Sequence, residues 1–174
     1  MERRQFLAAA PAGLLAAGGI AQSATASPRS NHGSRSVSGD APDALNALYR
    51  WALGYDSADV GLMRSAFTRD ARFIFRPVGG VGQPTIFEGI DAVMKLFTDS
   101  LAAQTDKRRH VTTNPLVERV TQQAVKVTSY LTLIIIENGV LRVQATGVYR
   151  DLVIARTDGD WRIKERDLTL DLPS

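Results

Sequence analysis

The sequence predicts a single α+β domain in which helices come first and a long antiparallel sheet follows. Apolar residues recur at helical spacing in segments 45–55 and 90–103. Beyond residue 108 the pattern changes to long runs rich in β-branched residues. Asn138-Gly139 and Asp158-Gly159 separate these runs, and both dipeptides are typical of tight hairpin turns. Helices followed by a meander of strands indicate the α+β class.

The N-terminal half of this domain carries the shorter elements. Asp40 or Asp43 can cap a first helix, whose apolar positions are Leu45, Leu48, Trp51, Ala52 and Tyr55. Further helices are expected over Val60–Phe67 and Ile90–Ala103, with extended pieces at 71–76 and 85–88 and a Gly- and Pro-rich loop at 77–84. The C-terminal half is predicted to form four strands, over 109–120, 124–137, 140–156 and 161–170.

The net positive charge of the chain lies ahead of the predicted domain. The 174 residues have a net charge of +3, and residues 1–39 hold four arginines and one glutamate, so the remainder is close to neutral. A nucleic-acid-binding face needs Lys and Arg clustered on the folded part, so no nucleic-acid partner is predicted. The chain has no cysteine, which excludes disulfides, thiolate nucleophiles and cysteine-ligated metals.

The first forty residues are expected to be an export signal and a tether. Arg3-Arg4 precedes Phe6-Leu7, an apolar stretch runs from residue 8 to 21, and Ala24-Thr25-Ala26 offers a small-residue cleavage site. The paired arginines resemble the twin-arginine motif, which is read by a receptor and is not an anchor. We therefore expect a signal peptide at 1–26, a disordered linker at 27–41 and a domain at 42–174, in a periplasmic or secreted protein that meets the membrane only during export.

Six ordered stretches of the domain resemble the SnoaL-like group of the nuclear transport factor 2-like superfamily. They are Gly54-Tyr55-Asp56, Leu62 to Ala71, Phe87 to Val93, Arg109 to Pro115, Gly147 to Asp151 and Asp160 to Ile163. The resemblance implies a cone of three N-terminal helices packed on a strongly curved, mostly antiparallel sheet, frequently dimeric through that sheet. Its members include dehydratases, isomerases, cyclases, epoxide hydrolases and non-catalytic subunits, so the fold does not supply the activity.

His110 and Asp56 are the candidate catalytic residues. His110 is the one histidine of the domain, and its strand pattern places Thr112, Asn114 and Leu116 on the same side. It is either a general acid/base or a half-buried structural histidine. Asp56 stands at a helix C-terminus, which the helix dipole disfavours, so it either caps the next turn or orients His110.

Other residues of the domain are candidates for the rest of the site. Tyr55-Asp56 and His110 resemble the constellation of scytalone dehydratase, which has a second histidine where 124–137 here has none. Tyr55, Asn114, Tyr149 and Trp51 are the candidate substrate-binding residues. Arg142, Arg150 and Arg166 are expected on the solvated face or in ion pairs. No cofactor or metal is predicted, because the chain lacks a phosphate loop and a pair of histidines in the domain.

Two classes of function remain open from the sequence. One is a cofactor-independent lyase or isomerase acting on a small apolar or aromatic, polyketide-like molecule, with His110 and Asp56 in contact beside a cavity. The other is a non-catalytic binding or assembly module, whose interior is filled by Trp51 and several phenylalanines. Ile134 and Ile136 are expected to face outward and to favour a homodimer through the sheet.

Overall fold

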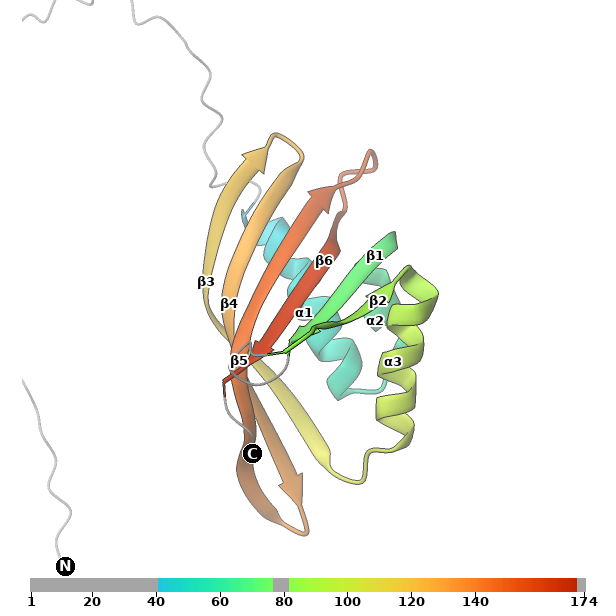
Figure 1. Cartoon of the computed structure of the whole chain (residues 1–174), viewed down its shortest axis with the longest axis vertical. Helices are drawn as coiled ribbons and strands as arrows, with labels where there is room; N and C mark the ends of the chain where they lie inside the picture. The colour runs from blue at the N-terminus through green and yellow to red at the C-terminus, as the bar shows by residue number, and fades with distance from the viewer. Residues whose placement is uncertain (1–40, 77–81, 172–174) are drawn as a thin grey trace, which may run out of the picture. The chain divides into compact units, whose positions relative to one another are not determined.

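The computed structural model describes residues 41–76 and 82–171. The expected signal peptide, and the expected linker up to residue 40, lie outside these residues. The described elements follow in the order α1 Ala41–Asp56, α2 Val60–Ser65, β1 Phe67–Arg76, β2 Thr85–Glu88, α3 Ile90–Ala102, β3 Lys107–Thr121, β4 Ala124–Glu137, β5 Val140–Ala155 and β6 Trp161–Leu170 (Figure 1). None of these helices is long and apolar enough to cross a membrane.

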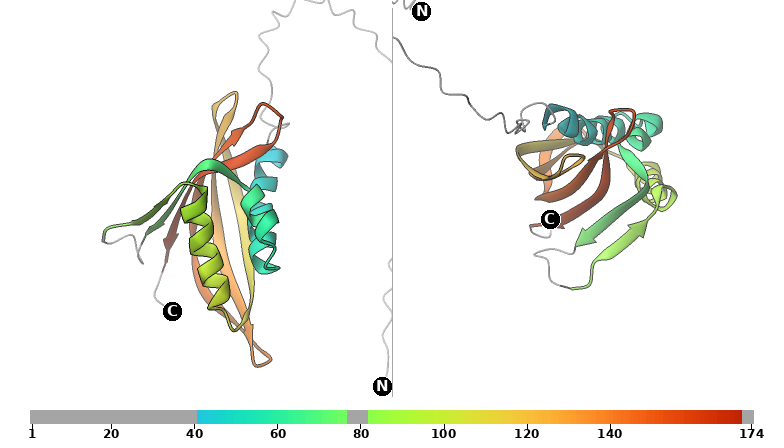
Figure 2. Two further views of the ribbon diagram at one scale, coloured as in Figure 1. Left: turned by 90° about the vertical axis from the view of Figure 1, so that its right-hand side faces the viewer. Right: turned by 90° about the horizontal axis from the view of Figure 1, so that it is seen from above.

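The described strands form one six-stranded sheet in the order β2-β1-β6-β5-β4-β3. All neighbouring pairs are antiparallel except β1 and β6, which are parallel, so the sheet is mixed but mostly antiparallel. The Asn138-Gly139 turn has positive φ at both residues (51° and 79°), the backbone of a type I′ hairpin, as predicted. The sheet curls around α1 and α3, which lie on the same face (Figure 2).

Two helices precede the sheet and α3 follows β2, so the helices do not form one N-terminal block. The predicted second helix is too long: α2 ends at Ser65, and Phe67 begins β1. Phe67 pairs with Ile163 of β6, and the Ile163 N–H donates to the Ala66 carbonyl at 2.8 Å. The backbone hydrogen-bonding groups at Ala66 and Phe67 are used in the sheet, so the helix cannot continue through them. This is an effect of tertiary structure, which local helix propensity does not show.

Aromatic rings fill the described interior between α1, α3 and the sheet. Phe97 of α3 lies within 6.0 Å, ring centroid to centroid, of Trp51, Tyr55, Phe67 and Phe73. All of these side chains are buried, together with aliphatic residues of β4 and β5. The expectation of an interior packed with aromatic side chains is therefore met by Trp51, Phe73 and Phe97.

The outer face of β3, β4 and β5 exposes apolar side chains. Ile136 is on this face, as predicted, opposite Leu141, and Ile134 is opposite Val143. We call the exposed members the outer patch: Val111, Leu116, Tyr130, Ile136, Leu141 and Val143. A sheet face that borders water is normally lined by polar residues, so this face is unusually apolar.

Candidate functional site

Asp56 and His110 are in direct contact although they lie 54 residues apart in the chain. The Asp56 Oδ1 atom is 2.6 Å from His110 Nδ1, and Asp56 Oδ2 accepts the His110 backbone N–H at 2.9 Å. The side chains are only 10% and 8% exposed. Because a carboxylate accepts, Nδ1 is the donor in this contact, and in the neutral imidazole Nε2 therefore holds the lone pair.

The turn after α1 aims Asp56 at His110. Gly54 lets the helices approach, since a Cβ built there would lie 2.5 Å from the Met63 backbone nitrogen of α2. Ala58 has a φ of 56°, and Asp59 caps α2 by accepting the Leu62 N–H. Asp59 therefore performs the capping, and Asp56 is left to bind His110. This contact also explains a carboxylate at the unfavourable end of a helix dipole.

Two aromatic rings hold the His110 imidazole from the side of α1. Trp51 and Tyr55 each meet it edge-on, with centroids 4.9 Å and 4.8 Å away. The Tyr55 hydroxyl lies 2.7 Å from Ser100 Oγ of α3, so it is engaged within the protein. His110 Nε2 has no hydrogen-bond partner within the described part of the chain.

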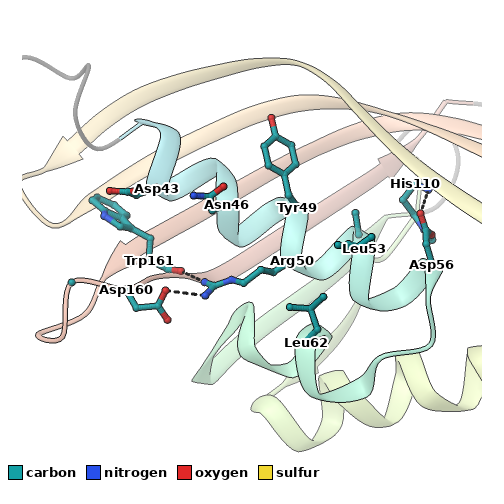
Figure 3. Close-up of a pocket in the computed structure, with 12 residues that line it drawn as sticks. Asp43, Asn46, Tyr49, Arg50, Leu53, Asp56, Leu62, His110, Asp160 and Trp161 are labelled. Carbon is teal, nitrogen blue, oxygen red and sulfur yellow. Dashed lines mark hydrogen bonds and ion pairs between the residues drawn. The ribbon is translucent and has the colours of Figure 1, made fainter.

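A groove of about 780 Å³ runs along the outer side of α1 and reaches the Asp56–His110 pair. Figure 3 shows the pair at one end of this groove and Asp43, Asp160 and Trp161 at the other. Leu53 and Leu62 give its middle an apolar lining. Arg50 connects α1 to β6 here, since it donates to Asp160 Oδ1 at 2.9 Å and to the Trp161 carbonyl at 2.6 Å.

The other sequence-predicted binding residues lie apart from one another. Asn114 is exposed, with a φ of 52°, at a bulge that shifts the β3 register between Thr113 and Leu116. Beyond this bulge the faces of β3 exchange: Val117 packs against the core and Leu116 is 60% exposed. The expectation that Leu116 shares the face of His110 is therefore wrong.

Tyr149 and Trp51 are inside the domain. The side chain of Tyr149 is 1% exposed and its ring centroid lies 5.7 Å from that of Trp51. Burial raises the pKa of the Tyr149 hydroxyl well above its ordinary value. A tyrosine with its pKa raised in this way keeps its proton at neutral pH, and its hydroxyl can take part only in hydrogen bonds.

The sequence reasoning missed the burial of Arg166 of β6 and its partner, Asp151 of β5. Arg166 Nε and Nη2 donate to the two Asp151 carboxylate oxygens at 2.7 and 3.0 Å, and neither side chain is exposed. Of the two expectations for Arg166, the solvated face is therefore wrong and the ion pair is confirmed. Alternation along β5 was a usable signal, because it puts Asp151 between Tyr149 and Val153 on the inner face. In β6 a register shift beside Lys164 changes which alternate residues face inward. Simple alternation along the sequence therefore does not predict that Arg166 is buried.

Among residues 41–76 and 82–171 no group of three or more His, Cys, Asp or Glu side chains is placed to hold a metal ion. The described residues instead provide an imidazole, His110, that is oriented by a carboxylate and packed against two aromatic rings.

The fold is shared with several solved proteins. An NTF2-like protein with a cystatin-like fold from Novosphingobium aromaticivorans aligns with a TM-score of 0.63 and 17% identity, over 75% of this chain and 81% of that one. ActVI-ORFA from Streptomyces coelicolor aligns with 0.65 and 17%, over 76% and 98%. The β subunit of a putative aromatic-ring-hydroxylating dioxygenase from N. aromaticivorans aligns with 0.67 and 17%, over 80% and 94%.

At these identities the likeness shows the fold alone. No curated protein matches the sequence. The SnoaL-like domain family matches residues 40–167, which is most of the chain and includes every element from α1 to the greater part of β6. The chain belongs to the SnoaL-like domain family.

Proposed function

We propose that this protein is a cofactor-independent acid/base enzyme of the lyase or isomerase type, with His110 as the proton-transfer group. The observation that carries the proposal is the 2.6 Å contact between Asp56 and His110 Nδ1, which leaves Nε2 without a partner among the described residues. An imidazole held by a buried carboxylate is the standard means of presenting a base at neutral pH.

The chemistry follows from the orientation of the ring. Nε2 takes a proton from a carbon or hydroxyl of the substrate, and the imidazolium that forms is stabilised by the negative Asp56. The same Nε2–H then returns the proton to another atom of the substrate, which gives isomerisation, or to a departing hydroxyl, which gives loss of water. Asp56 keeps its charge throughout and acts as a positioning residue.

The substrate class is inferred from the surroundings of the pair. Leu53 and Leu62 line the groove beside it, and aromatic rings pack against the imidazole. Such surfaces favour a small, mostly apolar or aromatic molecule, in which a carbonyl or hydroxyl marks the reacting end. We infer a polyketide-like or similar aromatic ligand.

The test uses a general probe for bases, because the natural substrate is unidentified. In 5-nitrobenzisoxazole, Nε2 would remove the ring C–H proton, the C–H electron pair would become part of a nitrile, and the N–O bond would break to give a coloured phenolate. We expect the full chain to accelerate this reaction, and His110→Gln, which keeps an N–H for Asp56 but no base, to lose the acceleration.

His32→Ala is the matched control, since it removes the other histidine of the chain, which lies ahead of the domain. It should react at the wild-type rate. Circular dichroism and thermal unfolding establish that each variant is folded. A folded His110→Gln that reacts as fast as the wild type would contradict the proposal.

A second candidate is a non-catalytic assembly module. It is favoured by the outer patch and by the fold shared with a dioxygenase β subunit. The outcome above separates the two, because an assembly module has no reason to accelerate proton transfer.

We also propose that the domain is exported and forms a homodimer. Export is supported by Arg3-Arg4, the apolar stretch at 8–21 and Ala24-Thr25-Ala26. Dimerisation is supported by the outer patch, which is large and apolar for a face that borders water.

A further inference from the structure

A second cavity, of about 530 Å³, lies beside the start of β1 and shares no lining residue with the groove along α1. Five basic side chains line it, which are Arg64, Arg69, Arg156, Arg162 and Lys164. Asp70 is the one acid among its described lining residues. We call this cavity the basic pocket. Its volume is in the range of small-molecule sites, and it concentrates positive charge in a domain that as a whole is close to neutral.

A bulge in β1 forms one side of the basic pocket. β1 is out of register with β6 between Phe67 and Arg72, where four residues of β1 lie opposite Lys164 alone. Three of those four residues line the pocket together with Lys164; they are Thr68, Arg69 and Asp70. A bulge changes the direction of side chains, and bulges are over-represented next to functional sites. The fold therefore gathers these groups where the pairing of the two strands is interrupted.

The four arginines of the basic pocket retain hydrogen-bond donors. Arg64, Arg156 and Arg162 each contact a carboxylate through a single nitrogen, at 2.8, 3.4 and 2.8 Å respectively. Arg69 is exposed and makes no hydrogen bond or ion pair with any described residue. A guanidinium has five N–H donors, so these arginines can still form the paired contacts that oxyanions accept.

The groups next to Arg69 in the bulge are also suited to an anion. Lys164 forms an ion pair with Asp70, so the carboxylate of the pocket has its own counter-ion. Lys164 and then the nearby Thr68 hydroxyl lower the pKa of Asp70. Thr68 is only 7% exposed, and its Oγ1 atom is buried without a hydrogen bond of normal geometry to any described residue. Buried polar groups are normally hydrogen-bonded, so this hydroxyl lacks a partner that a ligand oxygen could supply.

This lining suits a phosphate group better than a carboxylate. A phosphate carries close to two negative charges at neutral pH and has three strong acceptor oxygens, so it can use several guanidinium groups and a hydroxyl at the same time. Ile154, which is paired with Arg162 across β5 and β6, and Ile90 add apolar surface to the same cavity. The cavity can therefore also hold an organic group that carries the phosphate.

We propose that the basic pocket binds a phosphate group, with Arg69 and Thr68 as donors to its oxygens and the other arginines around it. Two sources share this chemistry, inorganic phosphate and a small organic phosphate, and the experiment distinguishes them. The site is separate from the Asp56–His110 pair, so this proposal and the proposed enzyme activity stand or fall independently.

The experiment is isothermal titration calorimetry of the full chain with inorganic phosphate and with phenyl phosphate. Sodium chloride holds the ionic strength constant, because salt screens exposed charges. We expect saturable binding of phosphate. Affinity about tenfold higher for phenyl phosphate would identify an organic phosphate as the ligand, since its ring removes apolar surface from water, and equal affinity would identify inorganic phosphate. Benzoate, which has the same ring but one charge, should bind about tenfold more weakly than phenyl phosphate.

Two variants test the proposed donors. Arg69→Gln should weaken phosphate binding about tenfold or more, because it removes hydrogen bonds from a charged group. Thr68→Val should weaken it about threefold to tenfold. The Thr68 hydroxyl has no good partner in the free protein, so this variant should unfold at the wild-type temperature when phosphate is absent. A loss of binding is then not a loss of fold.

Arg150→Gln is the matched control. Arg150 is an exposed arginine of β5 that also has no described partner, and it does not line the basic pocket. Its replacement removes the same charge and should leave phosphate binding unchanged. Absence of saturable binding would overturn the proposal, and so would wild-type affinity in Arg69→Gln or Thr68→Val. An equal loss in Arg150→Gln, or benzoate binding as tight as that of phenyl phosphate, would show general attraction of anions and would also overturn it.

Discussion

At the residue scale, both carboxylate oxygens of Asp56 are used by one partner, His110, through its ring and its backbone N–H. The type of atom at each of these two positions therefore determines which ring nitrogen of His110 carries the proton. In Asp56→Asn the amide oxygen would accept the backbone N–H, and the amide nitrogen would then donate to Nδ1. The imidazole would then be held in the tautomer with its proton on Nε2. In that tautomer Nε2 has no lone pair and cannot act as a base.

We therefore expect Asp56→Asn to slow proton abstraction from 5-nitrobenzisoxazole by about tenfold or more. Nitrogen chemical shifts of the His110 ring should show the proton moving from Nδ1 to Nε2. Asp59→Asn is the control, because asparagine caps a helix as well as aspartate does. An unchanged tautomer together with an unchanged rate would contradict the role of Asp56.

Asp160 ties the start of β6 to α1 and should make stability depend on acid. Burial raises the pKa of its carboxyl, but hydrogen bonds from Arg162 and Arg50 outweigh burial and leave the pKa below the ordinary value of 3.8. A depressed carboxyl pKa stabilises the fold above the unfolded value, and this contribution is lost as the pH falls below about 3.8.

We expect Asp160→Asn to lower the free energy of unfolding at neutral pH and to flatten its decrease below pH about 4. Urea unfolding at a series of pH values measures both effects. Asp171→Asn, at an exposed carboxylate with no described side-chain partner, should follow the wild-type curve. A parallel decrease in wild type and Asp160→Asn would show that Asp160 does not contribute.

At the element scale, the contact between α1 and α2 has no room for a side chain at Gly54. A Cβ there would lie 2.5 Å from the Met63 nitrogen and 2.8 Å from its Cα, and backbone cannot yield as a flexible side chain can. We expect Gly54→Ala to destabilise the protein by about 1–3 kcal/mol in chemical unfolding. It should also weaken proton transfer, because Asp56 is two residues away.

Gly61→Ala is the matched control within α2. Its added Cβ would meet only Asp59 Oδ1, at 3.4 Å, and alanine favours a helix by about 0.5–1 kcal/mol over glycine. The stability of this variant should therefore stay level or rise. Equal destabilisation by the two substitutions would show that helix packing at Gly54 is not the cause.

At the scale of the whole molecule, the outer patch should govern assembly. Light scattering on the full chain at micromolar concentration should report a dimer, and Val143→Asp in the patch should give a monomer. Leu53→Asp is the control, because Leu53 is similarly exposed (62% against 57%) but lies on α1. A wild-type monomer under these conditions would remove the dimer proposal.

Export is the second property of the whole chain. Replacement of Arg3 and Arg4 by lysine keeps the charge but removes the twin-arginine motif, so we expect the uncleaved chain to stay in the cytoplasm. Cell fractionation with mass spectrometry of the wild-type protein should show cleavage after Ala26. Equal export of both forms would contradict the assignment of residues 1–26.

The sequence by itself determined the order of helices and strands, the Asn138-Gly139 turn, the inner face of α1 and membership of the fold. The elements, the turn and the inner face of α1 depend on local periodicity and turn chemistry, which each segment expresses alone. The fold family was implied by the resemblance of six ordered stretches to the SnoaL-like group. His110 and Asp56 were also found as candidates, from residue type and position.

Only the tertiary structure decided that Asp56 binds His110 and does not cap α2, that Phe67 belongs to β1, and that Arg166 is buried against Asp151. The physical reason for the first two is a partner far away in the sequence, His110 for Asp56 and Ile163 for Phe67, and for Arg166 it is the register shift beside Lys164. A bulge exchanges the faces of a strand, and whether one forms depends on the neighbouring strand, not on the local pattern.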